Sequence, residues 1–412
     1  MARNRVIYQS EALFVNKQYS GHNTIDIVDG DTVGSPGQAE PGISHNNFHQ
    51  IHRVQSANYS FSINRTDVNQ FGNLARIDTA VIEAPTVSLD FTYLLTDGVN
   101  EDALGISVDP RNSGSAGGEG GAEPVGGVLV ATSAISGLLA NTSGRNYHIL
   151  TTKEGTDANG NSSSATGEGS TVISIGNGFV TNYSMEASVG SIPTASVSVE
   201  GLNIRSDNAA DGLTTPAVDP EDGTVGTGNY TLPDPVSGSV GEILRPGDVE
   251  LSLGNPALIS NLSDSAGSNS AHIQSFNVSL PMGRSNLQRL GSSFGFSKEV
   301  DFPVSVSVGV SAIMADIRDG QSLFTELYAN NKHDLVFTLR KPNSAGAKQG
   351  DPQVAFIVKN AVLESESFSS SIGDNKSVDF SFTATVGGPE DITNGLFISG
   401  TKCGGDDVRS AD

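Results

Sequence analysis

Three histidines lie close together near the start of the chain, in the stretch "HNNFHQIH". His45, His49 and His52 could ligate a metal ion, because neutral imidazole is a common zinc ligand. They precede a strand-like segment, and neither a carboxylate nor a cysteine lies at a spacing that would complete such a site. A polar loop explains them more simply, so the sequence predicts no metal site and no cofactor.

A second candidate is the polar stretch "DANGNSSSATGE". It places Asp157, Asn159, Asn161 and Glu168 at the first, third, fifth and twelfth positions of a calcium-binding loop. The sixth position is Ser162, where the sharp turn requires glycine, and the flanking segments alternate as strands rather than helices. We interpret the stretch as a plain hairpin loop.

The stretch "GSSFG", residues 291–295, matches the nucleophile-elbow pattern around Ser293. That pattern requires a strand before the serine and a helix after it. The residues that follow lead into a strand, and no combination of serine, histidine and acid accompanies the match. The sequence therefore predicts no catalytic residues and no enzyme.

The composition indicates the elements that must position any functional residues. Among 412 residues there are 48 glycines, no tryptophan and only 6% aromatic residues, and short runs of Val, Ile and Leu are separated by Gly, Ser, Asn and Thr. Such a composition is typical of a mainly β protein with long loops. The single cysteine, Cys403, excludes an intrachain disulfide, so the fold depends on burial.

The charge balance narrows the possible partners. The formal net charge is −23, which argues against an unaided phosphate-binding surface. No stretch approaches the ~18 apolar residues of a membrane span, and the first residues lack a signal-peptide core. We expect a chain that is made and folded in a cytoplasm and has no membrane partner, although export by another route stays open.

One strand-like phrase occurs twice, as "QSANYSFSINRTDVNQFG" at 55–72 and "QSFNVSLPMGRSNLQRLG" at 274–291. Six of the eighteen positions are identical, and the apolar positions keep the period of two that a half-buried strand requires. Further on, "IEAPTVSLDF" corresponds to "VDFPVSVSVGV" with a slip of one residue. The pattern indicates an internal duplication.

The remaining segments follow the same order in both copies. A short helix is predicted at 133–141 and again at 322–330, and each is followed by a strand and a long-stranded hairpin. The hairpin strands are "VISIGNGFVTNYSMEAS" with "TASVSVEGL" in the first copy, and "VAFIVKNAVLESESF" with "SVDFSFTATV" in the second.

The domain boundaries follow from composition. We predict a first β domain at 1–203, a Pro-, Gly- and Asp-rich linker at 204–242, a second β domain at 243–388 and a C-terminal tail at 389–412. The first copy carries about 30 extra residues, with a Gly-rich acidic insertion at about 95–125 that is too polar to make a core. We expect this insertion to act as an arm or lid, or as a plain surface loop.

Two segments carry a family resemblance: "ANYSFSINRTDVNQFGNLARIDTAVIEAPTVSLDFTYLLTDGVNEDALG" and "VGSIPTASVSVEGLNI". They resemble segments of phage tail tube (major tail) proteins. The resemblance implies two tandem tail-tube-like β-sandwich or barrel domains, each with one short α-helix. It also implies a virion structural protein in the phage tail, with trimeric rings of pseudo-sixfold symmetry stacked into a tube.

The same resemblance implies the partners. These are further copies of the chain, together with tape-measure, tail-tip and tail-terminator proteins, while DNA passes through an acidic lumen without specific binding. The strands at 55–65, 85–94, 274–282 and 303–311 are the expected contributors to that lumen. Another virion component, such as a baseplate, neck or decoration protein, and a surface adhesin or binding β protein remain alternatives. Inserting a charge at Phe61 or Leu89 should block folding or assembly.

Overall fold

The computed structural model is mainly β, as the sequence predicts. It describes residues 11–17, 48–82, 85–110, 132–140, 144–153, 155–159, 169–219, 223–225, 229–233, 235, 244, 249–253, 272–290, 294–295, 297–313, 331–340, 352–369 and 377–400. In the first half of the chain the elements are β1 (Glu11–Lys17), β2 (Phe48–Ile51), β3 (Val54–Ser62), β4 (Arg65–Val68), β5 (Asp78–Val81), β6 (Thr86–Leu94), α1 (Val99–Leu104), β7 (Val108–Pro110), α2 (Ser136–Ala140), β8 (Arg145–Thr151), β9 (Thr171–Ser188), β10 (Thr194–Gly201) and β11 (Asn203–Asn208).

The 3₁₀ helix η3 and further strands complete the chain. They are η3 (Ala209–Asp211), β12 (Leu213–Thr214), β13 (Asn229–Tyr230), β14 (Val249–Leu253), β15 (His272–Pro281), β16 (Arg284–Leu287), β17 (Ser297–Val300), β18 (Ser305–Ile313), β19 (Lys332–Arg340), β20 (Pro352–Ser369), β21 (Ser377–Thr385) and β22 (Gly395–Gly400). The predicted strands of both copies, including all four hairpin strands, are confirmed.

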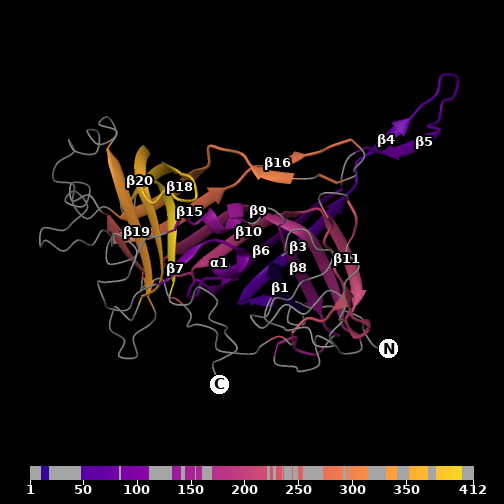
Figure 1. Ribbon diagram of the computed structural model, residues 1–412. Helices are drawn as coiled ribbons and strands as arrows, with labels where there is room; N and C mark the ends of the chain where they lie inside the picture. The colour runs from indigo at the N-terminus through magenta and orange to yellow at the C-terminus, as the bar shows by residue number, and fades with distance from the viewer. Residues whose placement is uncertain are drawn as a thin grey trace, which may run out of the picture.

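One large sheet runs through both halves of the chain (Figure 1). Its main path is β14-β19-β20-β21-β18-β15-β9-β10-β6-β3, so the two halves meet where β15 pairs antiparallel with β9. The pairing pattern is repeated on either side of this junction. In the first half β3 pairs with β6, β6 with β10, β10 with β9 and β9 with β8; in the second, β15, β18, β21, β20 and β19 pair in the same order.

The irregularities of the sheet are repeated too. Gln55 in β3 and Gln274 in β15 are each skipped in the pairing with the next strand. Thr181 in β9 and Glu364 in β20 are skipped in the same way. Such β-bulges bend a strand and increase its twist. Positions in β3 to β6 therefore correspond to positions 219 residues later (274 minus 55), and positions in β9 and β10 to positions 183 later (364 minus 181).

This constant spacing corrects one expectation. A slip of one residue was expected between 82–91 and 300–310, but β6 at 86–94 and β18 at 305–313 are 219 residues apart, like β3 and β15. Because valine recurs at every second position of this strand, several alignments of the two copies fit the sequence equally well. The hydrogen-bond register instead pairs Leu89 with Tyr59 and Val308 with Val278.

The long strands β9 and β20 each pass from one layer of the fold to the other. The first part of β9 pairs with β8 and β11, and its second part with β10 and β15. At the change of layer Asn177 has a φ of 50°, and Asn360 of β20 has a φ of 56°. Asparagine tolerates this left-handed region better than most residues. A core cluster lies between the layers and draws on both halves; Phe91 contacts Tyr147, and Phe276 stacks on Phe337 with ring centroids 4.3 Å apart.

The start of the predicted insertion belongs to the core, which was not expected. Residues 99–104 form α1, and Leu95, Leu104 and Ile106 are fully buried. The expectation that this segment is too polar to make a core was wrong for residues 95–110, because several of its polar side chains are hydrogen-bonded inside the protein. Asn100, for example, exchanges two hydrogen bonds of 2.9 Å with the backbone of His52.

Parts of the predicted linker and tail are also ordered. β11 pairs with the first part of β9, and Leu213, Val218 and Leu232 are buried after it. β22 pairs antiparallel with β20 and parallel with β7, and all six of its residues are buried. The domain boundaries themselves stay a prediction, but these segments pack as strands rather than as a linker and a free tail.

α2 confirms most of the helix expected at 133–141, whereas the helix expected at 322–330 lies outside the described residues. In the part of the chain that the structure describes, no helix is long and apolar enough to cross a membrane.

Candidate functional site

The large sheet presents a continuous polar face. In β6, β10, β18 and β21 every second residue is buried, and the residues between them are exposed or half-buried. The outward residues of the sheet are Ser56, Asn58, Ser60 and Ser62 in β3, Ser88, Asp90 and Thr92 in β6, Ser196, Ser198 and Glu200 in β10, Asn182, Ser184 and Glu186 in β9, Ser275, Asn277 and Ser279 in β15, Ser305, Ser307, Gly309 and Ser311 in β18, Asp379, Ser381 and Thr383 in β21, and Ser365 and Ser367 in the second part of β20. We call this set the polar face.

The polar face carries acidic side chains and no basic ones of its own. Asp90, Glu186, Glu200 and Asp379 are acidic, none of its residues is lysine or arginine, and Glu200 is paired with Lys298 of the hairpin β16–β17. The small hydroxyl side chains bond to one another across strands: Ser60 Oγ lies 2.7 Å from Ser88 Oγ. Ser56 Oγ and Thr92 Oγ1 form a second such pair at 2.8 Å. The carboxylates of the face repel phosphate.

Two hairpins leave the sheet at equivalent places. β4 and β5 continue β3 and lead into β6, and β16 and β17 do the same between β15 and β18. Every residue from 61 to 78 is exposed, and Phe71 and Leu74 near the turn are fully accessible. Figure 1 shows β4 and β5 projecting well beyond the body of the molecule.

The second hairpin instead packs on the first half of its own chain. Arg284 of β16 donates to the carbonyl oxygen of Val180 in β9 at 3.2 Å, and its guanidinium lies 5.0 Å from the centre of the Phe179 ring. Lys298 of β17 forms an ion pair with Glu200 of β10, with its side chain almost fully buried. Arg65, the counterpart of Arg284, is exposed.

The core below the polar face holds a buried carboxyl group. Glu101 of α1 accepts hydrogen bonds from the hydroxyls of Tyr93 (2.8 Å) and Tyr183 (3.0 Å), so it fastens α1 to β6 and β9. Burial raises the pKa of Glu101, and the two tyrosine hydroxyls partly oppose that rise. Neither the helix nor this buried acid was predicted, because a polar Gly-rich segment gives no core signal until its partners are known.

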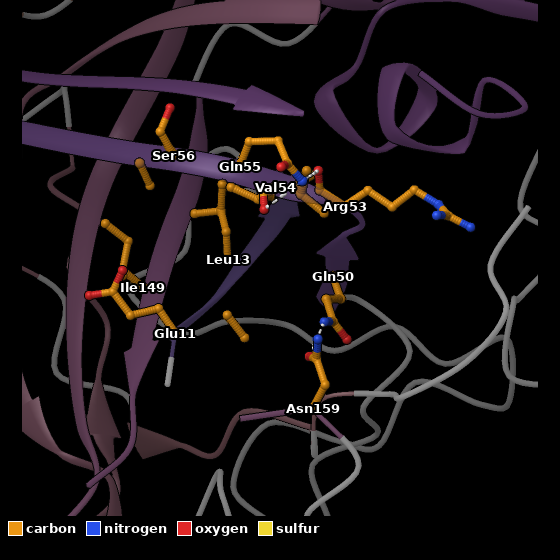
Figure 2. Close-up of a pocket in the computed structure, with 12 residues that line it drawn as sticks. Glu11, Leu13, Gln50, Arg53, Val54, Gln55, Ser56, Ile149 and Asn159 are labelled. Carbon is orange, nitrogen blue, oxygen red and sulfur yellow. Dashed lines mark hydrogen bonds between the residues drawn. The ribbon is translucent and has the colours of Figure 1, made fainter. Parts of the chain in front are cut away.

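A small cavity of about 130 Å³ lies between β1, β2 and β3 (Figure 2). Gln50 donates to Asn159 at 2.8 Å on one side, and Glu11, whose pKa is raised by burial, lies on another. Figure 2 shows the Arg53 side chain pointing away from the cavity. Among the described residues that line it, Glu11 is the one carboxyl and no histidine occurs.

The structure describes only some of the residues that the sequence offered as metal, calcium or catalytic candidates. His49 lies in β2, where it pairs with Val15, and His52 follows that strand, while His45 lies outside the described residues. Asp157 and Asn159 are described, but Asn161, Ser162, Glu168, Ser293 and Cys403 are not. Within the described ranges no group of three metal-ligating side chains occurs.

The sequence also left the contributors to the polar face incomplete. It indicated β3, β6, β15 and β18, but not β10, β21 and the second part of β9, which carry Glu186, Glu200 and Asp379. The available signal was the alternation of Ser, Thr or Asn with Val or Phe in those strands. This alternation shows which residues of one strand share a face, but only the pairing of strands shows which strands share a sheet.

The fold and this face thus define a mainly β protein built on one extended sheet with an acidic, hydroxyl-rich surface. No protein-family model matches the chain, and no curated protein matches it. Among solved structures, a structure of the SPP1 tail tube obtained by solid-state NMR and cryo-EM is similar, with a TM-score of 0.24 and 16% sequence identity over 39% of this chain and 81% of that chain.

Proposed function

We propose that the protein is a virion structural protein that self-assembles into a phage tail tube, through which DNA passes. The observation that carries this proposal is the polar face, which extends over strands of both halves and has no lysine or arginine among its residues. A tube lining needs to let a polyanion slide past without binding it. Carboxylates repel phosphate within the ~8 Å screening length of physiological salt, and no lysine or arginine of the face attracts it.

The repeated pairing order and the repeated bulges support an internal duplication. Two similar halves in one chain allow three chains to supply six similar units, so the proposed ring is a trimer with pseudo-sixfold symmetry. Rings stack into the tube, and the exposed hairpin with Phe71 and Leu74 is an apolar surface suited to contacts between molecules. We retain the domain boundaries given above as part of this proposal.

The proposed partners are further copies of the chain and the tape-measure, tail-tip and tail-terminator proteins of the same virion. The localisation is the phage tail, after synthesis in the host cytoplasm. The proposal includes neither a cofactor nor a catalytic residue.

The test is negative-stain electron microscopy of the purified protein across a concentration series, with mass photometry on the same samples. We expect rings of threefold mass with a sixfold outline, or hollow tubes. A protein that stays monomeric at every concentration, also after addition of a tail-tip complex, would contradict the proposal and favour a decoration protein or an adhesin.

A further inference from the structure

The junction between the two halves provides a template for a junction between molecules. Residues 182–188 of β9 pair antiparallel with residues 275–281 of β15. On the core side of this junction Val278, Leu280 and Met282 are 0%, 0% and 1% exposed. Beside it, Arg284 and Lys298 fix the second hairpin to β9 and β10.

Each strand of this junction has a counterpart elsewhere in the chain. β3 corresponds to β15 at a spacing of 219, and the second part of β20 corresponds to the second part of β9 at a spacing of 183. Both spacings rest on matching bulges in the hydrogen-bond pattern. The correspondence therefore holds residue by residue.

Both counterparts have an unpaired edge in the described part of the molecule. β3 pairs with β6 alone, and residues 363–369 of β20 pair with β21 alone. An unpaired edge is a template for a strand of another chain. Tyr59, Phe61 and Ile63 are 46%, 46% and 37% exposed, although their counterparts Val278, Leu280 and Met282 are buried.

We propose that β3 of one molecule pairs antiparallel with the second part of β20 in a second copy of this chain, with Ser60 opposite Ser367 and Ser62 opposite Ser365. This register repeats the one at the junction of the two halves, where Ser279 lies opposite Ser184 and Pro281 lies opposite Asn182. It places Phe61 opposite Glu366, as Leu280 lies opposite Tyr183. It also extends the polar face without a break from one molecule to the next.

The same pairing gives the first hairpin, β4 and β5, a contact with the second copy. Arg284 bonds to the carbonyl of Val180, and the residue 183 positions later is Leu363 of β20. Arg65 is the counterpart of Arg284, so the pairing brings its guanidinium to the Leu363 carbonyl of the second copy. Because the interface uses different surfaces of the two molecules, repetition adds further copies head to tail and closes into a ring when the rotation allows. The inference rests on the self-assembly proposed above and specifies its surface.

Cysteine cross-linking in a Cys403→Ser background tests the register, since Cys403 is the only cysteine. The variant with Ser60→Cys and Ser367→Cys should oxidise to covalent dimers and larger species on a non-reducing gel. The matched control carries Ser184→Cys and Ser279→Cys, which pair within one chain and should lose free thiols without a gain in mass. A second control combines Ser62→Cys with Ser367→Cys, a diagonal pair ~7–8 Å apart that is too distant for a good disulfide.

The outcomes separate this inference from the proposed function. Covalent multimers from the Ser60 and Ser367 pair, at least ~10-fold faster than from the diagonal pair, support the register. Equal rates for the two pairs would overturn it. Rings or tubes without cross-links would overturn the interface and leave the tube proposal intact. Cross-linked multimers that never form rings or tubes would support the interface and contradict the tube, and a permanent monomer without cross-links would overturn both.

Discussion

At the scale of single residues, Glu101 shows how an unpredicted polar group stabilises the fold. Its carboxyl lies fully buried between two tyrosine hydroxyls, and burial raises its pKa. A carboxyl whose pKa is higher in the folded than in the unfolded protein binds protons more tightly when folded. Its contribution to stability is therefore complete below its unfolded pKa and is lost as the pH rises through the folded value.

The variant Glu101→Gln should remove this pH dependence. The glutamine carbonyl still accepts from both tyrosines, and no charge has to be buried. We expect the melting temperature of the variant to rise relative to the wild type as the pH increases from 4 to 8. His148, whose pKa burial lowers to about 3, has the opposite pH dependence but is common to both proteins, so the difference between their melting curves isolates Glu101.

A difference that stays constant with pH would contradict this account of Glu101. Tyr93→Phe serves as a control. It removes one hydrogen bond to the Glu101 carboxyl and should lower the free energy of unfolding by ~1–3 kcal/mol.

Leu89 and Phe61 distinguish folding from assembly. Leu89 is fully buried, so Leu89→Asp places a charge in the core and should prevent folding. Phe61 is 46% exposed on the edge strand, so Phe61→Asp should leave a folded monomer that does not assemble. Circular dichroism and mass photometry on both variants provide the check; an unfolded Phe61→Asp protein would show that the edge is part of the monomer core.

At the scale of elements, the hairpins β4–β5 and β16–β17 occupy equivalent positions in the two halves but have different surroundings. Arg284 bonds to β9 and to the backbone of β17, whereas Arg65 is exposed. Arg284→Ala should lower the free energy of unfolding of the monomer by ~1–3 kcal/mol, because it leaves a buried carbonyl without its donor. Arg65→Ala should change it by less than ~0.5 kcal/mol. Chemical denaturation of the two variants measures this difference, and equal effects would contradict the docking of the second hairpin.

The strands were predictable from the sequence because they carry a strong local signal. In β6, β10, β18 and β21 a buried residue alternates with a small polar one, and this period survives whatever the strand packs against. The bulges at Gln55 and Thr181 were not predictable, because a skipped residue is defined by the partner strand. For the same reason the sequence missed α1 and β22, whose burial depends on contacts far along the chain.

At the scale of the whole molecule, the polar face should determine how the protein meets DNA. A variant with Asp90→Lys, Glu186→Lys and Asp379→Lys changes the net charge from −23 to −17, two charges at each of three positions. We expect it to bind duplex DNA with an affinity that falls steeply between ~50 and ~200 mM salt, as phosphate contacts do. Fluorescence anisotropy of a labelled duplex with unassembled protein measures this binding.

The control for the DNA experiment has the same net charge in other places. Asp157→Lys, Asp211→Lys and Glu390→Lys alter exposed acids outside the polar face. Binding as strong as that of the first variant would mean that total charge, rather than the face, governs the encounter with DNA.

The pairing of β7 with β22 joins residue 108 to residue 398 and so determines the order of events during synthesis. When a ribosome has made only the first half, β7 lacks β22, the strand with which it pairs in the described part of the molecule, and the backbone N–H of Ala134 lacks its acceptor, the carbonyl of Leu396. The first half therefore stays incomplete until β22 has emerged, 290 residues after Val108 (398 minus 108). A nascent chain stalled before β22 would expose the region around α1 to proteases, although every other strand of its own half had already been translated.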